Sequence, residues 1–114
     1  MEVYNSCQVL LCCLNLVSKN SASVNIKNLF DYLDICQSLS GIKDDDLQDF
    51  LNMRKDSERL SIILNYMQRR GFIEYKPEKS LISIKDSGRQ HTFSCFHHSL
   101  EEAIKINAES LLSK

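Results

Sequence analysis

The stretch that decides the fold is residues 56–73, which read DSERLSIILNYMQRRGFI. Four large apolar side chains recur in it at steps of three and four, which places them on one face of an α-helix: Leu60, Ile63, Leu64 and Met67. Asp56 or Ser57 is suited to cap this helix, because a capping side-chain oxygen accepts hydrogen bonds from the first backbone N–H groups. Gly71 is suited to end it. The stretch therefore predicts a helix that stops sharply before an apolar pair.

A β-hairpin is predicted directly after this helix. Residues 72–75 and 81–84 are rich in the aromatic and β-branched side chains that favour strands. Between them, residues 76–80 contain Pro77, the only proline of the chain, whose ring fixes its own φ angle in a turn.

Three further helices are predicted before the helix that begins near Asp56. They cover residues 3–18, residues 26 to about 38–41, and residues 44–52. Gly41 suits a left-handed helix end, and the acidic run that starts the third helix suits the positive end of a helix dipole. Val24–Ile26 has two interpretations, a short strand or a lead into the second helix.

The C-terminal part carries an apolar stripe at steps of three and four. Its members are Phe93, Phe96, Leu100, Ala103, Ile104, Ala108 and Leu111. The stripe predicts one long amphipathic helix over residues 87–112, or two helices broken near His98-Ser99. Ser99 and Glu102 have capping-box spacing, which favours the break.

Charge is polarised along the sequence, although the net charge is only −1. Between Arg54 and Arg89 lie nine basic and five acidic side chains, a local net charge of +4. The rest of the chain holds five basic and ten acidic side chains, a net charge of −5. Such a distribution is typical of a protein with one basic face, as nucleic-acid-binding domains have.

Residues 42–92 resemble MarR-like and related winged-helix regulators. The matching pattern is Leu60-Ser61, Leu64, Met67, Arg70, Gly71 and Phe72-Ile73, and Ile84-Lys85-Asp86-Ser87-Gly88-Arg89 resembles the exit from the family's hairpin. The chain departs from the family at Ile62, where the family carries a polar residue, and in its short turn at residues 76–80. The resemblance implies a mainly α protein with a small β-hairpin, a winged helix-turn-helix with long terminal helices. It divides a single domain over 1–114 into N-terminal helices (1–40), helix-turn-helix (42–71), wing (72–85) and dimerisation helix (87–113).

From this resemblance we expect sequence-specific binding of double-stranded DNA and regulation of transcription by a homodimer. A helix that follows a tight link can enter the major groove by its N-terminal end. The residues then expected at bases and phosphates are Arg54, Lys55, Ser57, Glu58, Arg59 and Ser61. Lys76 and Lys79 are expected at phosphates, which supply most of the affinity.

Alternative functions are a winged-helix protein-interaction module without DNA binding, or an enzyme. The sequence offers no nucleophile–base pair at recognisable local spacing and no glycine-rich phosphate loop, so we expect neither catalysis nor a cofactor. No residue indicates a small-molecule effector.

Self-association is expected through the C-terminal stripe, because it is larger than a core of this size needs at its edge. The interface residues would be Phe93, Phe96, Leu100, Ile104 and Leu111. The alternative is that the stripe packs on the first helix, and both can hold.

A metal site is the weaker hypothesis for the same segment. His91, Cys95 and His98 would share a face if one helix spanned them, but a fourth ligand such as His97 or a residue of a second copy would be needed, so no metal is predicted.

The five cysteines are odd in number and lack C-x-x-C spacing, which predicts free thiols in a reducing compartment, the cytoplasm. The apolar run at residues 9–17 is too short to span a bilayer, so no membrane partner is expected.

Overall fold

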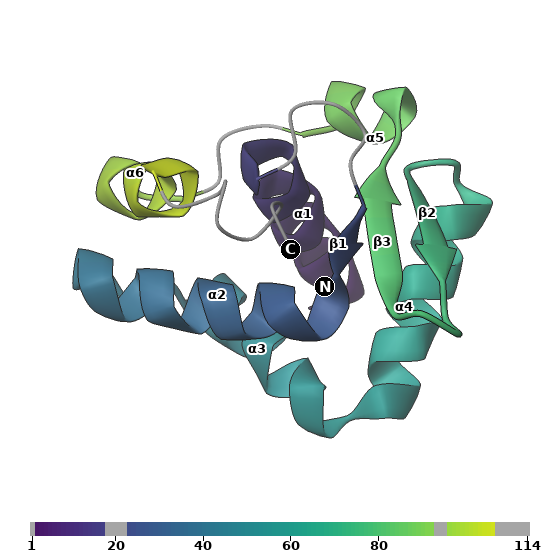
Figure 1. Ribbon diagram of the computed structural model, residues 1–114, viewed down its shortest axis with the longest axis horizontal. Coiled ribbons are helices and arrows are strands. Elements are labelled where there is room, and N and C mark those ends of the chain that lie inside the picture. Colours follow the sequence, from purple (N-terminus) through teal and green to yellow (C-terminus); the bar gives the residue numbers. More distant parts are fainter. Residues whose placement is uncertain (1, 18–22, 93–95, 107–114) are drawn as a thin grey trace.

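Helices form most of the protein, and a small sheet lies at one end (Figure 1). The computed structural model describes residues 2–17, 23–92 and 96–106. The elements are α1 (Glu2–Val17), β1 (Val24–Asn25), α2 (Ile26–Ser40), α3 (Asp45–Asn52), the 3-10 turn η1 (Met53–Lys55), α4 (Ser57–Arg69), β2 (Ile73–Lys76), β3 (Leu81–Ile84), α5 (Asp86–Gln90) and α6 (His98–Ile106). The prediction of a mainly α protein with a small β component is confirmed.

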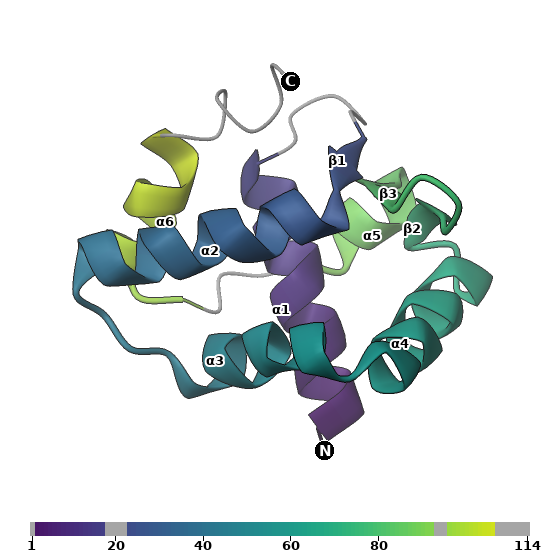
Figure 2. The ribbon, with the colours of Figure 1, turned by 60° about the horizontal axis from the view of Figure 1, so that its bottom comes forward.

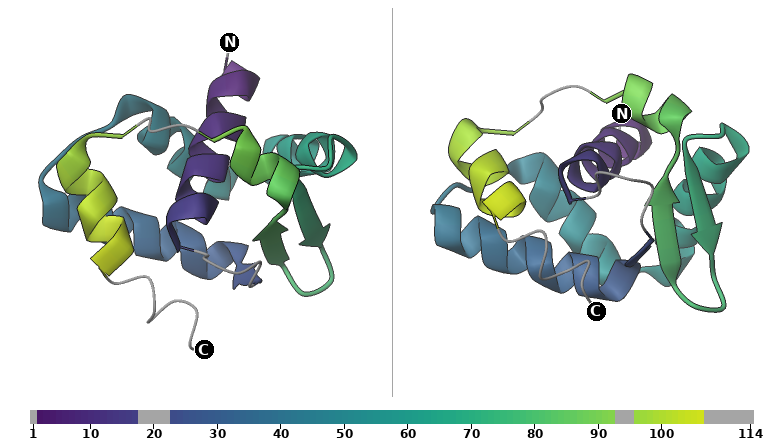
Figure 3. Two further views of the ribbon diagram at one scale, coloured as in Figure 1. Left: turned by 90° about the horizontal axis from the view of Figure 1, so that it is seen from above. Right: turned by 45° about the horizontal axis from the view of Figure 1, so that its top comes forward.

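The core is built around α1. This helix lies between α6 on one side and the sheet with α4 on the other (Figures 1, 2 and 3). Leu10, Leu11, Cys13 and Leu14 are fully buried although they point in different directions around the helix. A helix that is apolar on nearly all sides is a central helix, and the other helices and the sheet cover it.

Side-chain and glycine caps set the ends of the helices as the sequence predicts. Asp44 caps α3 by accepting from the N–H of Leu47 at 2.9 Å. Asp56, rather than its neighbour Ser57, caps α4 and accepts from the N–H of Arg59 at 3.1 Å. Gly41 ends α2 at a φ of 70°, a conformation that glycine adopts without strain.

The sheet has the order β1-β3-β2, and all its strands pair antiparallel. Ile82 of β3 is opposite Val24 on one side and Tyr75 on the other. The N–H of Ile26 also donates to the carbonyl of Ser80 at 2.9 Å. Val24–Asn25 is thus a strand and the lead into α2 at once, and it ties the start of α2 to the hairpin turn.

The C-terminal segment is not one long helix. It forms α5, which ends at Gln90, and α6, which begins at His98, so the expected long C-terminal helix over 87–113 is wrong within the described residues. Thr92 Oγ1 donates to the carbonyl of Arg89 at 2.7 Å, which occupies a terminal carbonyl of α5 where the helix stops. Ser99 is not the cap that its spacing predicted, since the N–H groups of Leu100 and Glu101 reach the carbonyl of His97.

The apolar stripe of α6 packs inside the chain. Phe96, Leu100 and Ile104 are buried where α6 packs against α1 and α2. The Tyr32 hydroxyl of α2 donates to the carbonyl of Ile104, which fixes the two helices together. The assignment of these three residues to a dimer interface is therefore wrong, because their side chains are already buried within the chain. Phe93 and Leu111 lie outside the described residues.

In the part of the chain that the structure describes, no helix combines the length and the apolar character that crossing a membrane requires.

Candidate nucleic-acid interface

A hollow of about 360 Å³ lies where three elements meet. Its walls come from the first turns of α2, the first turns of α4 and the hairpin, with Arg54 of η1 beside them. The start of α4 and the β2–β3 turn lie at the same edge of the molecule (Figure 1). The lining includes Lys27, Asp31, Ser57, Ser61, Tyr75 and Ser80.

The orientation of α4 follows from its buried face. Ile63, Leu64 and Met67 are buried, and on the sheet side Gln68 Oε1 accepts from the N–H of Tyr75 at 2.7 Å, which ties α4 to β2.

 
The residues on the opposite side of α4 are Glu58, Ile62, Asn65 and Arg69, and all four are exposed. Because the core and the sheet hold the buried side, this outward stripe is the side of α4 that faces away from the protein.

The predicted contact residues at the start of α4 lie at the surface. Lys55, Ser57, Glu58 and Ser61 are exposed, and Ser57 and Ser61 face the hollow. Arg59 is half-buried, and its backbone N–H is held by the Asp56 cap. The structure thus brings these predicted residues together at one helix end.

Arg54 is engaged within the chain. Its guanidinium lies 3.6 Å from Asp31 and 3.5 Å from Asp34, and its Nε donates to the carbonyl of Leu51 at 3.2 Å. These contacts hold η1 against α2. Both carboxylates are well exposed, so the ion pairs are weak and add little to stability.

The hairpin turn carries the two predicted lysines. Lys76 and Lys79 are exposed, and the N–H of Lys79 donates to the carbonyl of Lys76 at 3.1 Å, which closes the turn. Ser80 follows with a φ of 54°. The turn is short and defined by hydrogen bonds, so both ammonium groups start from a fixed backbone.

Sequence reasoning missed Lys27. This exposed residue lies in the first turn of α2 and lines the hollow. It reaches the site because β1 pairs with β3 and places the start of α2 beside the hairpin turn. A two-residue strand has no periodicity, so the only local signal was Asn25, which caps α2 through Oδ1.

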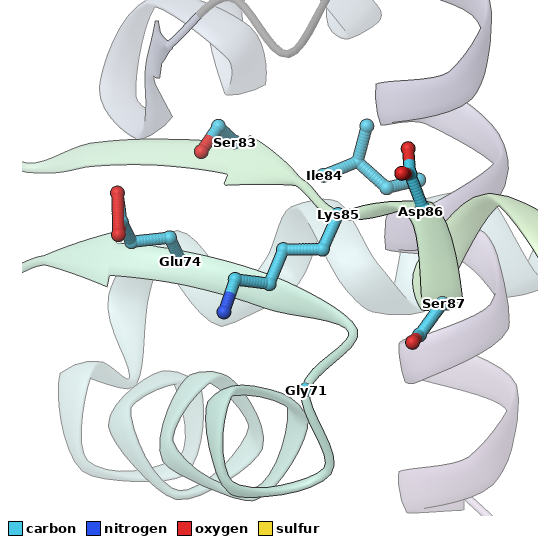
Figure 4. Close-up of a pocket in the computed structure, with 7 residues that line it drawn as sticks. All are labelled: Gly71, Glu74, Ser83, Ile84, Lys85, Asp86 and Ser87. Atoms are coloured by element: carbon cyan, nitrogen blue, oxygen red, sulfur yellow. The ribbon is translucent and has the colours of Figure 1, made fainter.

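A second hollow, of about 610 Å³, lies at the junction of the β2–β3 sheet and α5 (Figure 4). Glu74 and Ser83 stand on neighbouring strands, the Lys85 side chain extends toward β2, and Asp86 and Ser87 begin α5 (Figure 4). Its lining holds neither histidine nor cysteine. The acidic and basic side chains in the lining are Glu74, Lys85 and Asp86, and the arrangement does not contain the serine–histidine pair that most often activates a serine hydroxyl.

The premise of the metal hypothesis is wrong, because no single helix spans His91 to His98. His91 follows α5, with Nδ1 2.8 Å from the carbonyl of Ser87 and its ring 4.6 Å from that of Phe72, whereas His98 begins α6. Among the described residues no group of three or more potential ligands could hold a metal ion. Cys95 lies outside them.

Four cysteines belong to the core: Cys7, Cys12, Cys13 and Cys36 are buried and form no disulfide bond. Burial raises the pKa of the Cys7 thiol to about 11. A thiol is a poor nucleophile in this state, so these side chains serve as small apolar groups.

Comparison with known protein families, with curated proteins and with solved structures finds no match to this chain.

Proposed function

We propose that the chain is a winged-helix protein that binds double-stranded DNA and regulates transcription. In this proposal α4 enters the major groove by its N-terminal end, and the β2–β3 turn lies against the phosphate backbone. The start of α2 supplies a further backbone contact through Lys27.

The order of elements supports the winged-helix assignment. Two helices, α3 and α4, are joined by a tight link that consists of η1 and Asp56, as in a helix-turn-helix. The hairpin follows α4 directly, where a wing is expected. The third strand, β1, precedes α2 and joins the hairpin through β3.

One observation carries the functional proposal. Four exposed lysines belong to the three elements that meet near the start of α4: Lys27 of α2, Lys55 of η1, and Lys76 and Lys79 of the hairpin turn. Exposed cations on the elements next to a helix end suit the phosphates that border a groove. Asp56 caps α4 and keeps its negative charge, so the lysines must outweigh it for phosphate to bind here.

The proposal is tested by changing Lys76 and Lys79 together to alanine. Each lost phosphate contact lowers the slope of log affinity against log salt by about one, so we expect the slope to fall by about two on every duplex sequence. The measurement is fluorescence anisotropy with a random-sequence duplex between 50 and 200 mM salt, the range over which phosphate contacts change affinity steeply.

The matched control changes Lys43 and Lys105 to alanine. Both are exposed lysines, and they lie in the loop after α2 and on α6, at the other end of the molecule from the hairpin (Figure 1). The control removes the same charge and should keep the slope of the unchanged protein. Equal slopes for all three proteins would refute the assignment of the hairpin turn.

A second candidate function, a protein-interaction module, is favoured by one observation. Ile62 and Tyr66 lie one turn apart on α4 and are 58% and 46% exposed. An interaction module predicts no salt-dependent binding to duplex DNA, so the same titration separates the two functions.

A further inference from the structure

The outward stripe of α4 (Glu58, Ile62, Asn65 and Arg69) has an apolar member at its middle. Ile62 is 58% exposed, although isoleucine is among the residue types most often found fully buried. Its helix neighbours Ile63 and Leu64 are fully buried, so the core already has the apolar residues that this turn supplies. Ile62 stands out from the protein with a polar side chain one turn away on either side.

We propose that Ile62 reads thymine in the major groove, with Asn65 contacting an adenine close by. This inference rests on the proposed DNA binding, and it names the bases that α4 would select. Thymine alone among the four bases presents a methyl group in the major groove, and apolar side chains contact it there. Asparagine pairs with adenine through the N6 and N7 edge.

The spacing of the stripe suits consecutive base pairs. From Glu58 to Asn65 the helix rises about 10 Å, at about 1.5 Å per residue. Base pairs are stacked about 3.4 Å apart, so this length covers about three of them. Glu58 begins the stripe as an acceptor, which suits the amino group of a cytosine.

The composition of the stripe favours a groove over a protein partner. Its apolar part consists of Ile62 with Tyr66 at its side, while Glu58, Asn65 and Arg69 are polar or charged. Apolar patches that mark protein interfaces usually extend over several hundred Å². Alternating apolar and hydrogen-bonding side chains instead match the major groove, where methyl groups lie among donors and acceptors.

The test removes the thymine methyl and nothing else. Duplexes selected by the protein from a random library are resynthesised with deoxyuridine in place of each thymidine in turn. At the position that Ile62 contacts, the unchanged protein should lose about three- to fivefold in affinity, the effect of one buried methyl group. Ile62→Ala should bind the thymine duplex more weakly and should show no preference for thymine over uracil there.

The matched control is Ile35→Ala. Ile35 is 59% exposed on α2 and is not among the residues that line the hollow. This variant should keep the full preference for thymine. The combined measurement therefore separates a loss of one base contact from a general effect of removing an exposed isoleucine.

Each other outcome overturns a defined part of the inference. Duplex binding that is equally strong with uracil at every position overturns the thymine contact and leaves DNA binding intact. A preference for thymine that persists in Ile62→Ala overturns the assignment to Ile62. If the protein binds no duplex and Ile62→Ala instead abolishes binding to a partner protein, both the inference and the proposed function are wrong.

Discussion

Leu100→Ala removes apolar volume from the point where α6 packs against α1 and α2. Leu100 is fully buried, and its neighbours on the stripe, Phe96 and Ile104, are buried with it. The shorter side chain leaves a cavity at this junction, because the Tyr32 hydrogen bond holds α6 close to α2 and limits its movement.

The expected loss in the free energy of unfolding is about 3 kcal/mol, within the range for a buried leucine shortened to alanine. A domain of this size has a total stability of about 5–15 kcal/mol, so the effect is large but leaves the variant folded. With a urea dependence of about 1.5 kcal/mol per molar, the unfolding midpoint should fall by about 2 M.

Leu100→Glu should destabilise the fold further, since it also buries a carboxylate. Burial raises the pKa of that carboxyl in the folded state above its unfolded value of about 4.3. The folded variant then binds more protons than the unfolded chain, so its stability falls as the pH rises from about 4.3 through the folded-state pKa. We expect the variant to be more stable at pH 5 than at pH 8.

The assay is urea unfolding followed by circular dichroism, with Ile106→Ala and Ile106→Glu as controls on the same helix. Ile106 is 73% exposed, so both controls should change the stability by less than about 0.5 kcal/mol. The packing argument is refuted if Leu100→Ala unfolds at the wild-type midpoint while it converts a wild-type dimer into a monomer. That result would mean that the Leu100 side chain packs against a second copy of the chain.

Three further predictions concern other parts of the structure. Gly88→Ala should lower the free energy of unfolding by about 2 kcal/mol or more, because the new Cβ would lie 2.3 Å from the carbonyl oxygen of Phe72. Ser87→Ala should change it little, and equal melting temperatures of the two variants would contradict this close approach. Replacing both aspartates that pair with Arg54 by asparagine should raise duplex affinity severalfold in anisotropy titrations, since it releases a cation and removes two charges that repel phosphate; unchanged affinity would place Arg54 outside the interface. The four buried cysteines should react with a thiol reagent at pH 8 only after unfolding, because at a pKa of about 11 only about one Cys7 thiol in a thousand is ionised. Rapid labelling of Cys7 in the native protein would disprove its burial.

The local sequence determined the helix ends and the hairpin. Asp44, Asp56 and Gly41 act within a few residues of themselves, because a cap satisfies backbone groups of the adjacent turn. The apolar spacing of α4 likewise fixed which side of that helix is buried, and so which side carries Ile62. For these features the residues that decide the structure lie inside the element that they shape.

Only the tertiary structure decided what each buried face packs against. The stripe with Leu100 and Ile104 has the same periodicity whether it covers α1 and α2 or a second chain, since periodicity reports burial and not the partner. The hydrogen bonds of β1 come from β3, far along the chain, and they bring Lys27 to the hairpin turn. Arg54 finds its carboxylates on α2 for the same reason. The sequence by itself therefore determined the elements and their buried faces, whereas the site depends on contacts between distant segments, which only the packing of the whole chain creates.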